Sequence, residues 1–282
     1  MNTIKLPNFI ILGAQKSGTT SLHHALDIHP EVFVSDPKEI SFFNKDENYN
    51  RGIEFYGSFF KKWNNEKVAG ESTPSYLWDE RVPPRIKKVL PKAKFIILLR
   101  NPVDRAYSAY WYAFIGGDEV LSFEEALEAE SSRASQEPDI RGFSSYVDRG
   151  LYAAQIKRYY KQFSPDQFLI LIAEEYKKNP QLTMIEVTKF LEISCDQTFL
   201  DAVMNVKKNL SRVPRFKSIH RLVPFFSRNL PLGAKVIRRL NLKCDKYPPM
   251  DPYTRMKLKE HFSKSNQELE ELLKKKLDIW KE

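Results

Sequence analysis

Cysteine is scarce in this sequence: only Cys195 and Cys244 occur among 282 residues. Two cysteines so far apart do not provide the disulfide framework that stabilises small secreted domains, and they suit a reducing compartment. Stability must then come from a hydrophobic core, for which 42% hydrophobic residues, with 19 Phe and 13 Tyr, are ample. We therefore expect a cytoplasmic protein.

Long apolar runs are absent as well. No run approaches the length that crosses a membrane, and no cationic, apolar leader precedes the first hydrophobic segment. We expect no transmembrane segment, while peripheral membrane contact stays open. Internal repeats and low-complexity linkers are also lacking, so we expect a single domain over residues 1–282.

Acidic residues are nearly missing from residues 205–246. This segment holds twelve Lys and Arg and one acid, Asp245, and so carries +11, where the whole chain carries +9. A basic stretch indicates an anionic partner: a nucleotide, an anionic glycan, nucleic acid or a membrane surface. The alternative is a solvated, lysine-rich loop.

The main motif lies between Asn8 and Leu22, with the sequence NFIILGAQKSGTTSL. Phe9–Leu12 predict a strand that is buried on both faces. Gly13 and Gly18 enclose a polar loop, and a helix is expected directly after it. Amides at a helix start bind anions, and glycine lets the backbone approach them closely. The pattern predicts an anion-binding loop, with an ordinary strand-to-helix turn as the alternative.

The loop lacks the lysine of a Walker A motif. In that motif lysine directly follows the second glycine, whereas Thr19 has that place here and the loop's only lysine, Lys16, precedes Gly18. The loop is therefore expected to hold a phosphate-like group other than the β- and γ-phosphates of ATP. A nucleotide or small-molecule kinase with a degenerate P-loop remains the alternative.

A second cation follows the strand that is predicted at Phe95–Leu99. Arg100 stands where P-loop NTPases often have the aspartate that holds Mg²⁺, and its fixed charge suits phosphate. Pro102 opens a helix, and Ser108 lies two turns into it. Two phosphate sites without a metal-binding acid indicate a nucleotide with two separate anionic ends and no metal requirement. An ion pair between Arg100 and a neighbouring acid is the alternative.

Glu39 is the candidate general base. It follows a predicted strand, Val32–Val34, and lies near Phe42 and Phe43 in the sequence. A carboxyl group that is shielded by apolar side chains accepts a proton more readily near neutral pH. An exposed ion pair with Lys38 is an equally weighted alternative.

Other segments predict the scaffold. A strand that enters a proline turn brings Glu71 to the edge where open α/β sheets bind ligands. Helices are expected at residues 51–65 and 81–90, and Ser122 with Glu125 forms a capping box at the start of another. The final helix is expected to present four leucines on one face: Leu269, Leu272, Leu273 and Leu277. The aromatic run Tyr110, Trp111, Tyr112 and Phe114 is expected to pack in a core rather than to stack on a sugar.

Taken together, these motifs resemble those of sulfotransferases that use 3′-phosphoadenosine 5′-phosphosulfate (PAPS). The segment GAQKSGTT is similar to the family's 5′-phosphosulfate loop, and FIILLRNPVDRAYSAY is similar to its 3′-phosphate motif. PKEISFF resembles the segment that carries the catalytic glutamate in many glycan-type members, and ESTPSY matches a recurrent family stretch. The resemblance covers nearly the whole chain and is to the glycan-type branch, related to the heparan sulfate sulfotransferases, and its soluble bacterial relatives.

The resemblance implies an α/β, P-loop-like three-layer fold, in which helices flank a central parallel sheet of about five strands. It implies sulfuryl transfer from PAPS to a hydroxyl or amine of a glycan or small-molecule acceptor, which includes glycolipids and secondary metabolites. The product is 3′-phosphoadenosine 5′-phosphate (PAP), and neither a metal nor nucleic acid is expected as a partner. The acceptor's identity and the oligomeric state stay open, and a PAPS-binding protein without turnover is the non-enzymatic alternative.

The family's residue roles carry over to matching positions. Lys16 is implied to contact the bridging oxygen of the phosphosulfate, and Glu39 to deprotonate the acceptor. Arg100 and Ser108 are implied to hold the 3′-phosphate. The 5′ end is implied to bind at the loop and the helix start, through Ser17, Gly18, Thr19, Thr20 and Ser21.

A late segment departs from the family pattern. Relatives have a disulfide-flanked loop with a KGRxYP-like run over the cofactor, and the matching run here is KCDKYP. Lys243 and Tyr247 match and are implied to contact the cofactor, while Cys244 and Asp245 replace Gly and Arg. The short disulfide loop of the relatives is not expected here.

Overall fold

The structure is a computed structural model that describes residues 4–133, 144–206, 212–221, 223, 236–237 and 240–281. The chain forms two compact units. Unit 1 comprises residues 1–101, 152–207 and 265–282, and unit 2 comprises residues 102–151 and 208–264. The expectation of a single domain over residues 1–282 stays a prediction.

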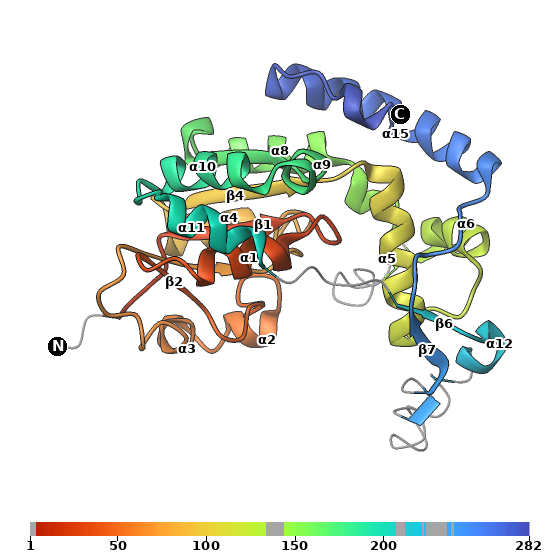
Figure 1. Cartoon of the computed structure of the whole chain (residues 1–282), viewed down its shortest axis with the longest axis horizontal. Coiled ribbons are helices and arrows are strands. Elements are labelled where there is room, and N and C mark those ends of the chain that lie inside the picture. Colours follow the sequence, from red (N-terminus) through yellow and green to blue (C-terminus); the bar gives the residue numbers. More distant parts are fainter. Residues whose placement is uncertain are drawn as a thin grey trace. The chain divides into compact units, whose positions relative to one another are not determined.

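Unit 1 is built on a parallel sheet of five strands in the order β2-β3-β1-β4-β5 (Figure 1). Its strands are β1 (Phe9–Gly13), β2 (Val32–Val34), β3 (Val68–Ser72), β4 (Lys94–Leu99) and β5 (Phe168–Ile172). Every pair of neighbouring strands is parallel. The predicted parallel sheet of about five strands is confirmed, and β1, which leads into the candidate anion loop, is its middle strand.

Eight α-helices are described wholly within unit 1. They are α1 (Thr19–Asp27), α2 (Asp46–Tyr49), α3 (Ile53–Ser58), α4 (Val82–Val89), α8 (Tyr152–Tyr160), α9 (Ala173–Lys178), α10 (Pro180–Leu191) and α11 (Gln197–Met204). The helix predicted at residues 51–65 is shorter than expected. Beyond α3, the Trp63 N–H donates to the Phe60 carbonyl, a tight turn in place of helical bonding.

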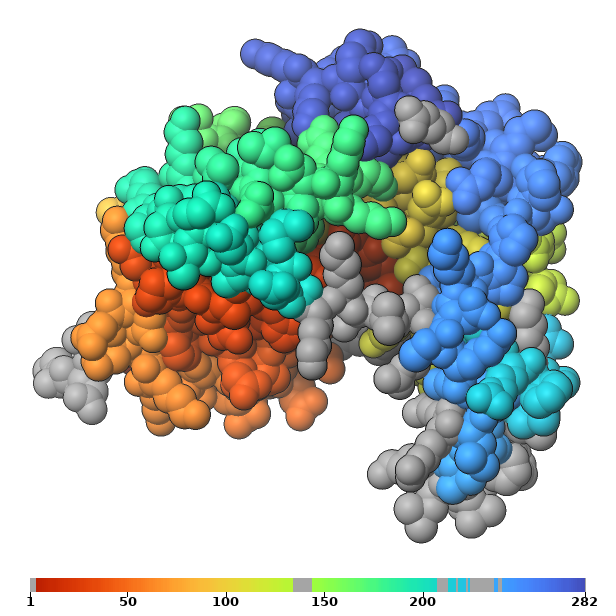
Figure 2. All heavy atoms as spheres, viewed as in Figure 1, coloured from red at the N-terminus to blue at the C-terminus, as the bar shows by residue number. Residues whose placement is uncertain are grey.

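Helices cover both faces of the sheet. Side chains alternate between the two faces of a strand, and in β1 Ile10 and Leu12 pack in one apolar cluster while Phe9 and Ile11 pack in another. The first cluster includes residues of α4 and α8, and the second includes residues of α1 and α10. In Figure 2 the segment from α10 to α11 lies beside the N-terminal segment that contains α1. The three-layer α/β fold is confirmed.

The described residues of unit 2 are mostly helical. It contains α5 (Pro102–Gly116), α6 (Phe123–Arg133), α12 (Lys217–His220) and an antiparallel pair, β6 (Arg212–Pro214) with β7 (Leu242–Cys244), that the sequence did not predict. As predicted for the aromatic run, Tyr110, Trp111 and Phe114 pack in the core of this unit, whereas Tyr112 is 53% exposed. The capping box of α6 is also confirmed, because the Glu125 N–H donates to Ser122 Oγ at 3.3 Å and the Ser122 N–H donates to Glu125 Oε2 at 2.7 Å.

The final helix, α15 (Pro252–Leu273), is shorter than predicted. It ends where Lys274 adopts a φ of 51°, a left-handed conformation that an α-helix does not tolerate. Leu277 is therefore not on the helix, although it is buried with Leu269 in the core of unit 1. Neither α15 nor any other helix in the described part of the chain is long and apolar enough to span a membrane.

Candidate functional site

The candidate anion loop joins β1 to α1, and two glycines fix its path. A Cβ atom on Gly13 would lie 2.9 Å from both the Pro74 carbonyl oxygen and Leu77 Cβ, so a larger residue does not fit. Gly18, directly before α1, has φ 101°, a conformation that glycine adopts without strain. The Ala14 N–H donates to the Leu98 carbonyl at 2.8 Å and holds the loop against the end of β4.

The start of α1 offers hydrogen-bond donors to a ligand. The first helical bond runs from the Leu22 N–H to the Gly18 carbonyl, so the amides of residues 19–21 precede the helical bonding pattern. No acidic side chain lies in the first turn. The Ser17 hydroxyl is buried and has no hydrogen-bond partner in the described part of the chain. An orphaned hydroxyl beside helix-start amides fits an oxygen-rich anion.

Lys16 lies in the same loop, at a φ of 66°. Burial first, and then the positive charges of Arg100 and Lys38, lower the pKa of its ammonium group to about 8, while Glu39 opposes this effect. Arg100 and Lys38 are thus close enough to Lys16 to repel it. A cluster of three cations is unfavourable by itself and becomes favourable when an anion binds among them.

Arg100 follows β4 directly, as predicted. Its Nη1 donates to the Lys16 carbonyl at 3.0 Å and ties the strand end to the loop. The hydroxyl of Tyr152, from α8, donates to the Arg100 carbonyl at 2.9 Å. Other arginines in the described part of the chain form ion pairs with acids, among them Arg81, Arg85, Arg133, Arg158 and Arg255. The alternative of an Arg100–acid pair is not found there.

Lys38 and Glu39 form the ion pair that the sequence left as an alternative, and the pair lies against the helix start. The Lys38 Nζ atom is 3.0 Å from Glu39 Oε1 and donates to Thr20 Oγ1, in the first turn of α1, at 3.1 Å. The side chain of Lys38 is 17% exposed and that of Glu39 is 51% exposed. Sequence reasoning gave Lys38 no site role, because its contact with Thr20 is made only in the folded chain.

Phe42 and Phe43 do not shield Glu39, so this expectation is wrong. Both rings are buried in the core of unit 1, where Phe42 stacks on Tyr56 and Phe43 meets Tyr76 edge-on. Their backbone amides donate to the Tyr76 hydroxyl at 2.8 and 3.3 Å. These hydrogen bonds hold the backbone where both rings point into the core. The side chain of Glu39 is therefore half exposed to solvent rather than shielded by these rings.

The remaining predicted residues belong to unit 2. Ser108 is buried on α5. Lys243, on β7, forms an ion pair with Asp245 at 2.7 Å, and both side chains are about half exposed. The ring of Tyr247 stacks on Trp111, with 5.5 Å between ring centroids. Asp245, which replaces an arginine of the family pattern, thus partly neutralises Lys243, and the cofactor roles of these residues stay predictions.

Glu71 and His23 are two of the buried titratable groups to which the sequence gave no role. Burial raises the pKa of Glu71, at the end of β3, to about 7, against the opposing effect of hydrogen bonds from Thr73, Tyr56 and Tyr76. Burial also lowers the pKa of His23, on α1, to about 3, and the charge of Lys38 adds to this effect. Glu71 was expected at the ligand edge of the sheet, but its complete burial was not foreseen.

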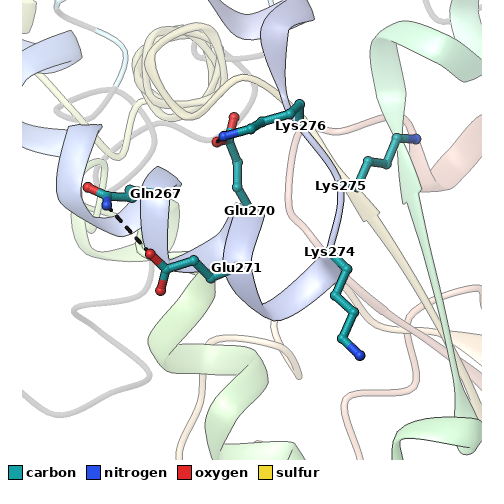
Figure 3. Close-up of a pocket in the computed structure, with 6 residues that line it drawn as sticks. All are labelled: Gln267, Glu270, Glu271, Lys274, Lys275 and Lys276. Carbon is teal, nitrogen blue, oxygen red and sulfur yellow. Dashed lines mark hydrogen bonds and ion pairs between the residues drawn. The ribbon is translucent and has the colours of Figure 1, made fainter.

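A separate hollow of about 320 Å³ lies in unit 1 beside the end of α15 (Figure 3). It is lined by Gln267, Glu270, Glu271, Lys274, Lys275 and Lys276. Lys275 is paired with Glu175 at 2.7 Å and Lys276 with Glu270 at 3.3 Å. The hollow contains no predicted site residue, and its paired charges leave little attraction for an anion.

The described residues contain no group of three or more His, Cys, Asp or Glu side chains that could hold a metal ion. The arrangement offers instead a glycine loop, a helix start and three cations within unit 1. Such a set of groups binds an anion and stabilises negative charge that develops on it.

Comparison with known proteins agrees with this chemistry. A family model described as a sulfotransferase domain matches residues 6–230. The chain is 34% identical over 277 residues to the bovine bifunctional heparan sulfate N-deacetylase/N-sulfotransferase 2, and 33% identical over 279 residues to the human protein of that name. These alignments cover 95% of this chain but only 30% of each relative.

Two solved structures share the fold. The sulfotransferase from Alicyclobacillus acidocaldarius is 29% identical, with a TM-score of 0.74 over 99% of this chain and 100% of that one. Mouse sulfotransferase SULT7A1, solved in complex with PAP, is 15% identical, with a TM-score of 0.58 over 98% of this chain and 86% of that one.

Proposed function

The chain belongs to the sulfotransferase domain family, and we propose that it transfers a sulfuryl group from PAPS to a hydroxyl or amine of an acceptor. The observation that carries the proposal is the gathering of Lys16, Lys38 and Arg100 around the loop at the start of α1. Because the chain spans about 30% of the length of its curated relatives, their activities do not transfer as a whole.

In this proposal the loop holds the 5′-phosphosulfate. The amides of residues 18–21 and the orphaned Ser17 hydroxyl donate to its oxygens. Arg100 contacts the 3′-phosphate, with Ser108 as its predicted partner in that role. Lys243 and Tyr247 are retained as predicted cofactor contacts, although Asp245 competes for the charge of Lys243.

Sulfuryl transfer resembles phosphoryl transfer, so positioning and charge stabilisation supply most of the catalysis. The acceptor's nucleophile attacks sulfur opposite the bridging oxygen, that S–O bond breaks, and PAP leaves with the electron pair. Lys16 stabilises the charge that grows on the bridging oxygen. Glu39 takes the acceptor's proton, and its half-exposed carboxylate leaves room for a large acceptor to approach.

A glycan is the acceptor class that we favour. The names of the curated relatives state that they act on heparan sulfate, and the basic segment at residues 205–246 would attract an anionic sugar chain. Much of that segment lies outside the described residues, but Arg215, Arg221 and Lys246 are described and exposed. We also place the protein in the cytoplasm, a reducing setting in which Cys195 and Cys244, both exposed and unpaired, remain thiols.

Binding of PAP without a metal tests the proposal. We expect isothermal titration calorimetry in EDTA to show tight PAP binding and weak ATP binding, because the cations of the site need no metal bridge to a phosphate. Adding Mg²⁺ should leave PAP affinity unchanged. Magnesium-dependent ATP binding as strong as PAP binding would instead support a kinase with a degenerate P-loop.

A further inference from the structure

Glu71 is a buried carboxylate that the proposed mechanism does not use. It is the residue before the last one of β3, is 1% exposed and lies among three hydroxyl groups. Tyr56, from α3, donates to its Oε1 at 2.7 Å, and Tyr76 donates to the same oxygen at 3.1 Å. Thr73 donates to its Oε2 at 2.7 Å. Complete burial of a carboxyl group is costly, so its retention calls for a reason beyond packing.

Two of these hydroxyls also hold the segment that follows Glu39. The Tyr76 hydroxyl accepts from the amides of Phe42, at 2.8 Å, and Phe43, at 3.3 Å. The Thr73 hydroxyl accepts from the Ser41 amide at 3.3 Å. Three successive amides are thus anchored to hydroxyls that donate to Glu71. Earlier in the same loop, the Lys38 carbonyl accepts a hydrogen bond from the amide of Ser72, the last residue of β3, at 3.2 Å.

The direction of these hydrogen bonds follows from the chemistry of each group. Backbone amides only donate, so the Tyr76 and Thr73 oxygens must accept from them. Each hydroxyl then has one proton left, and the carboxyl oxygens of Glu71 accept both of these protons. Glu71 therefore orients the two hydroxyls so that their lone pairs face the loop.

We infer that Glu71, acting through Thr73 and Tyr76, is a positioning residue that fixes the loop from Lys38 to Phe43 and so places Glu39 and Lys38 at the phosphosulfate loop. This inference rests on the proposed function for its catalytic consequence. The anchoring itself is independent of any substrate. Ser41, at a φ of 53°, turns the loop sharply between Glu39 and the buried rings, so the amides on either side of the turn need firm anchors.

The two tyrosines provide a matched test that is milder than Glu71→Ala, which would leave three hydroxyl groups without their acceptor and destabilise unit 1. Tyr56 and Tyr76 are both fully buried and both donate to Glu71 Oε1. Only Tyr76 also accepts from the loop amides. Tyr76→Phe and Tyr56→Phe each remove one hydroxyl from the same carboxylate, and only Tyr76→Phe releases the loop.

Hydrogen exchange measured by mass spectrometry on residues 38–43 gives the first readout. We expect Tyr76→Phe to speed exchange there by roughly tenfold or more, since two amides lose their acceptor, and Tyr56→Phe to leave it within about twofold of wild type. Equal exchange rates in the two variants would overturn the inference. This comparison needs no substrate, so it stands even if no sulfuryl transfer is found and the proposed function fails.

Kinetics with PAPS and the best acceptor give the second readout. We expect Tyr76→Phe to lower kcat by roughly tenfold or more and to change the KM for PAPS by a clearly smaller factor, because the loop carries the proposed base, Glu39, but only Lys38 of the three cations at the site. Tyr56→Phe should keep kcat near that of wild type. If exchange rises in Tyr76→Phe but kcat does not fall, Glu71 has no positioning role in the reaction.

Discussion

At the scale of single residues, Lys16 shows how a cation cluster prepares a site for an anion. Its ammonium group is partly buried and is repelled by Arg100 and Lys38, so the pKa of Lys16 falls to about 8 in the free protein. A bound phosphosulfate or phosphate would relieve that repulsion. The relief of this repulsion therefore adds to the free energy of anion binding. Because Lys16 loses its charge above about pH 8, this contribution depends on pH in a range that is easy to measure.

PAP affinity should fall as pH rises above about 8. The bound anion favours the charged form of Lys16, so binding is strongest where Lys16 is protonated and weakens by up to about tenfold per pH unit above its pKa. Lys38→Met removes one of the charges that lower this pKa, so the onset of the loss should move to higher pH. Calorimetry between pH 6 and 10 measures both, with the exposed Lys45→Met as control. An onset that is the same in wild type and Lys38→Met would contradict the assignment.

Glu39 should be required for turnover but not for nucleotide binding. Glu39→Gln keeps the shape of the side chain and removes the proton acceptor, so we expect kcat to fall by roughly 10²- to 10⁴-fold while PAP affinity stays within about twofold. Steady-state kinetics on the best acceptor, found by screening sugars, phenols and hydroxylated lipids, gives the first number. Glu47→Gln, an exposed glutamate on α2, is the control. Turnover near that of wild type in Glu39→Gln would require another base.

At the scale of elements, β3 carries a buried titratable side chain, Glu71, near its C-terminal end. In the folded protein, burial raises the pKa of Glu71 from 4.5 to about 7. Between these two pH values the native state keeps a proton that the unfolded state has released. Unfolding then becomes easier as pH rises through this range, and the effect levels off above about pH 7.

Glu71→Gln should remove this slope. We expect the free energy of unfolding of wild type, relative to Glu71→Gln, to fall by about 3 kcal/mol from pH 4.5 to pH 7.5. Urea denaturation at several pH values measures it, and taking the difference cancels the opposite effect of His23, whose pKa of about 3 favours folding as pH rises toward 6.5. Glu80→Gln, at an exposed position, is the control. Parallel pH curves for wild type and Glu71→Gln would contradict the prediction.

The sequence predicts these elements better than it predicts the contacts between them. Phe9–Leu12 and Phe95–Leu99 are apolar runs that suit strands buried on both faces, and the sheet has them there. The inward packing of Phe42 and Phe43 depends on Tyr76, more than thirty residues away. No local pattern encodes such a bond, so the packing of the two rings away from Glu39 was not predicted, although an exposed ion pair between Lys38 and Glu39 was one of the two alternatives.

Local sequence patterns do not encode contacts between distant residues, and this also explains which other site residues were predicted and which were not. Arg100 is placed by its strand and by a helix-opening proline, both of which are local signals. The hydrogen bond from Lys38 to Thr20 joins the loop after β2 to α1. In the sequence, neither residue alone can be distinguished from an ordinary surface residue. Glu71 was placed correctly at a strand end, but its three hydroxyl partners could not be foreseen from spacing.

At the scale of the whole molecule, the residues that the sequence predicts as nucleotide contacts are divided between the two units of the chain. Lys16 and Arg100 belong to unit 1, whereas Ser108 is on α5 in unit 2. The sequence predicts that Arg100 and Ser108 hold one and the same phosphate. Two residues that share a ligand group lose affinity non-additively when both are removed, and residues that act independently lose it additively.

A double-mutant cycle on PAP affinity decides between these cases. Arg100→Ala should cost about 1.5–3 kcal/mol, as expected for a charge-assisted contact, and Ser108→Ala should cost about 0.5–1.5 kcal/mol. The double variant should lose at least about 0.5 kcal/mol less binding free energy than the sum of the two single losses. The reason is that, once Arg100 is removed, Ser108 also holds the phosphate less firmly. Ser131→Ala, at an exposed position on α6, combined with Arg100→Ala should be additive. If Arg100 and Ser108 are additive as well, they do not share the phosphate.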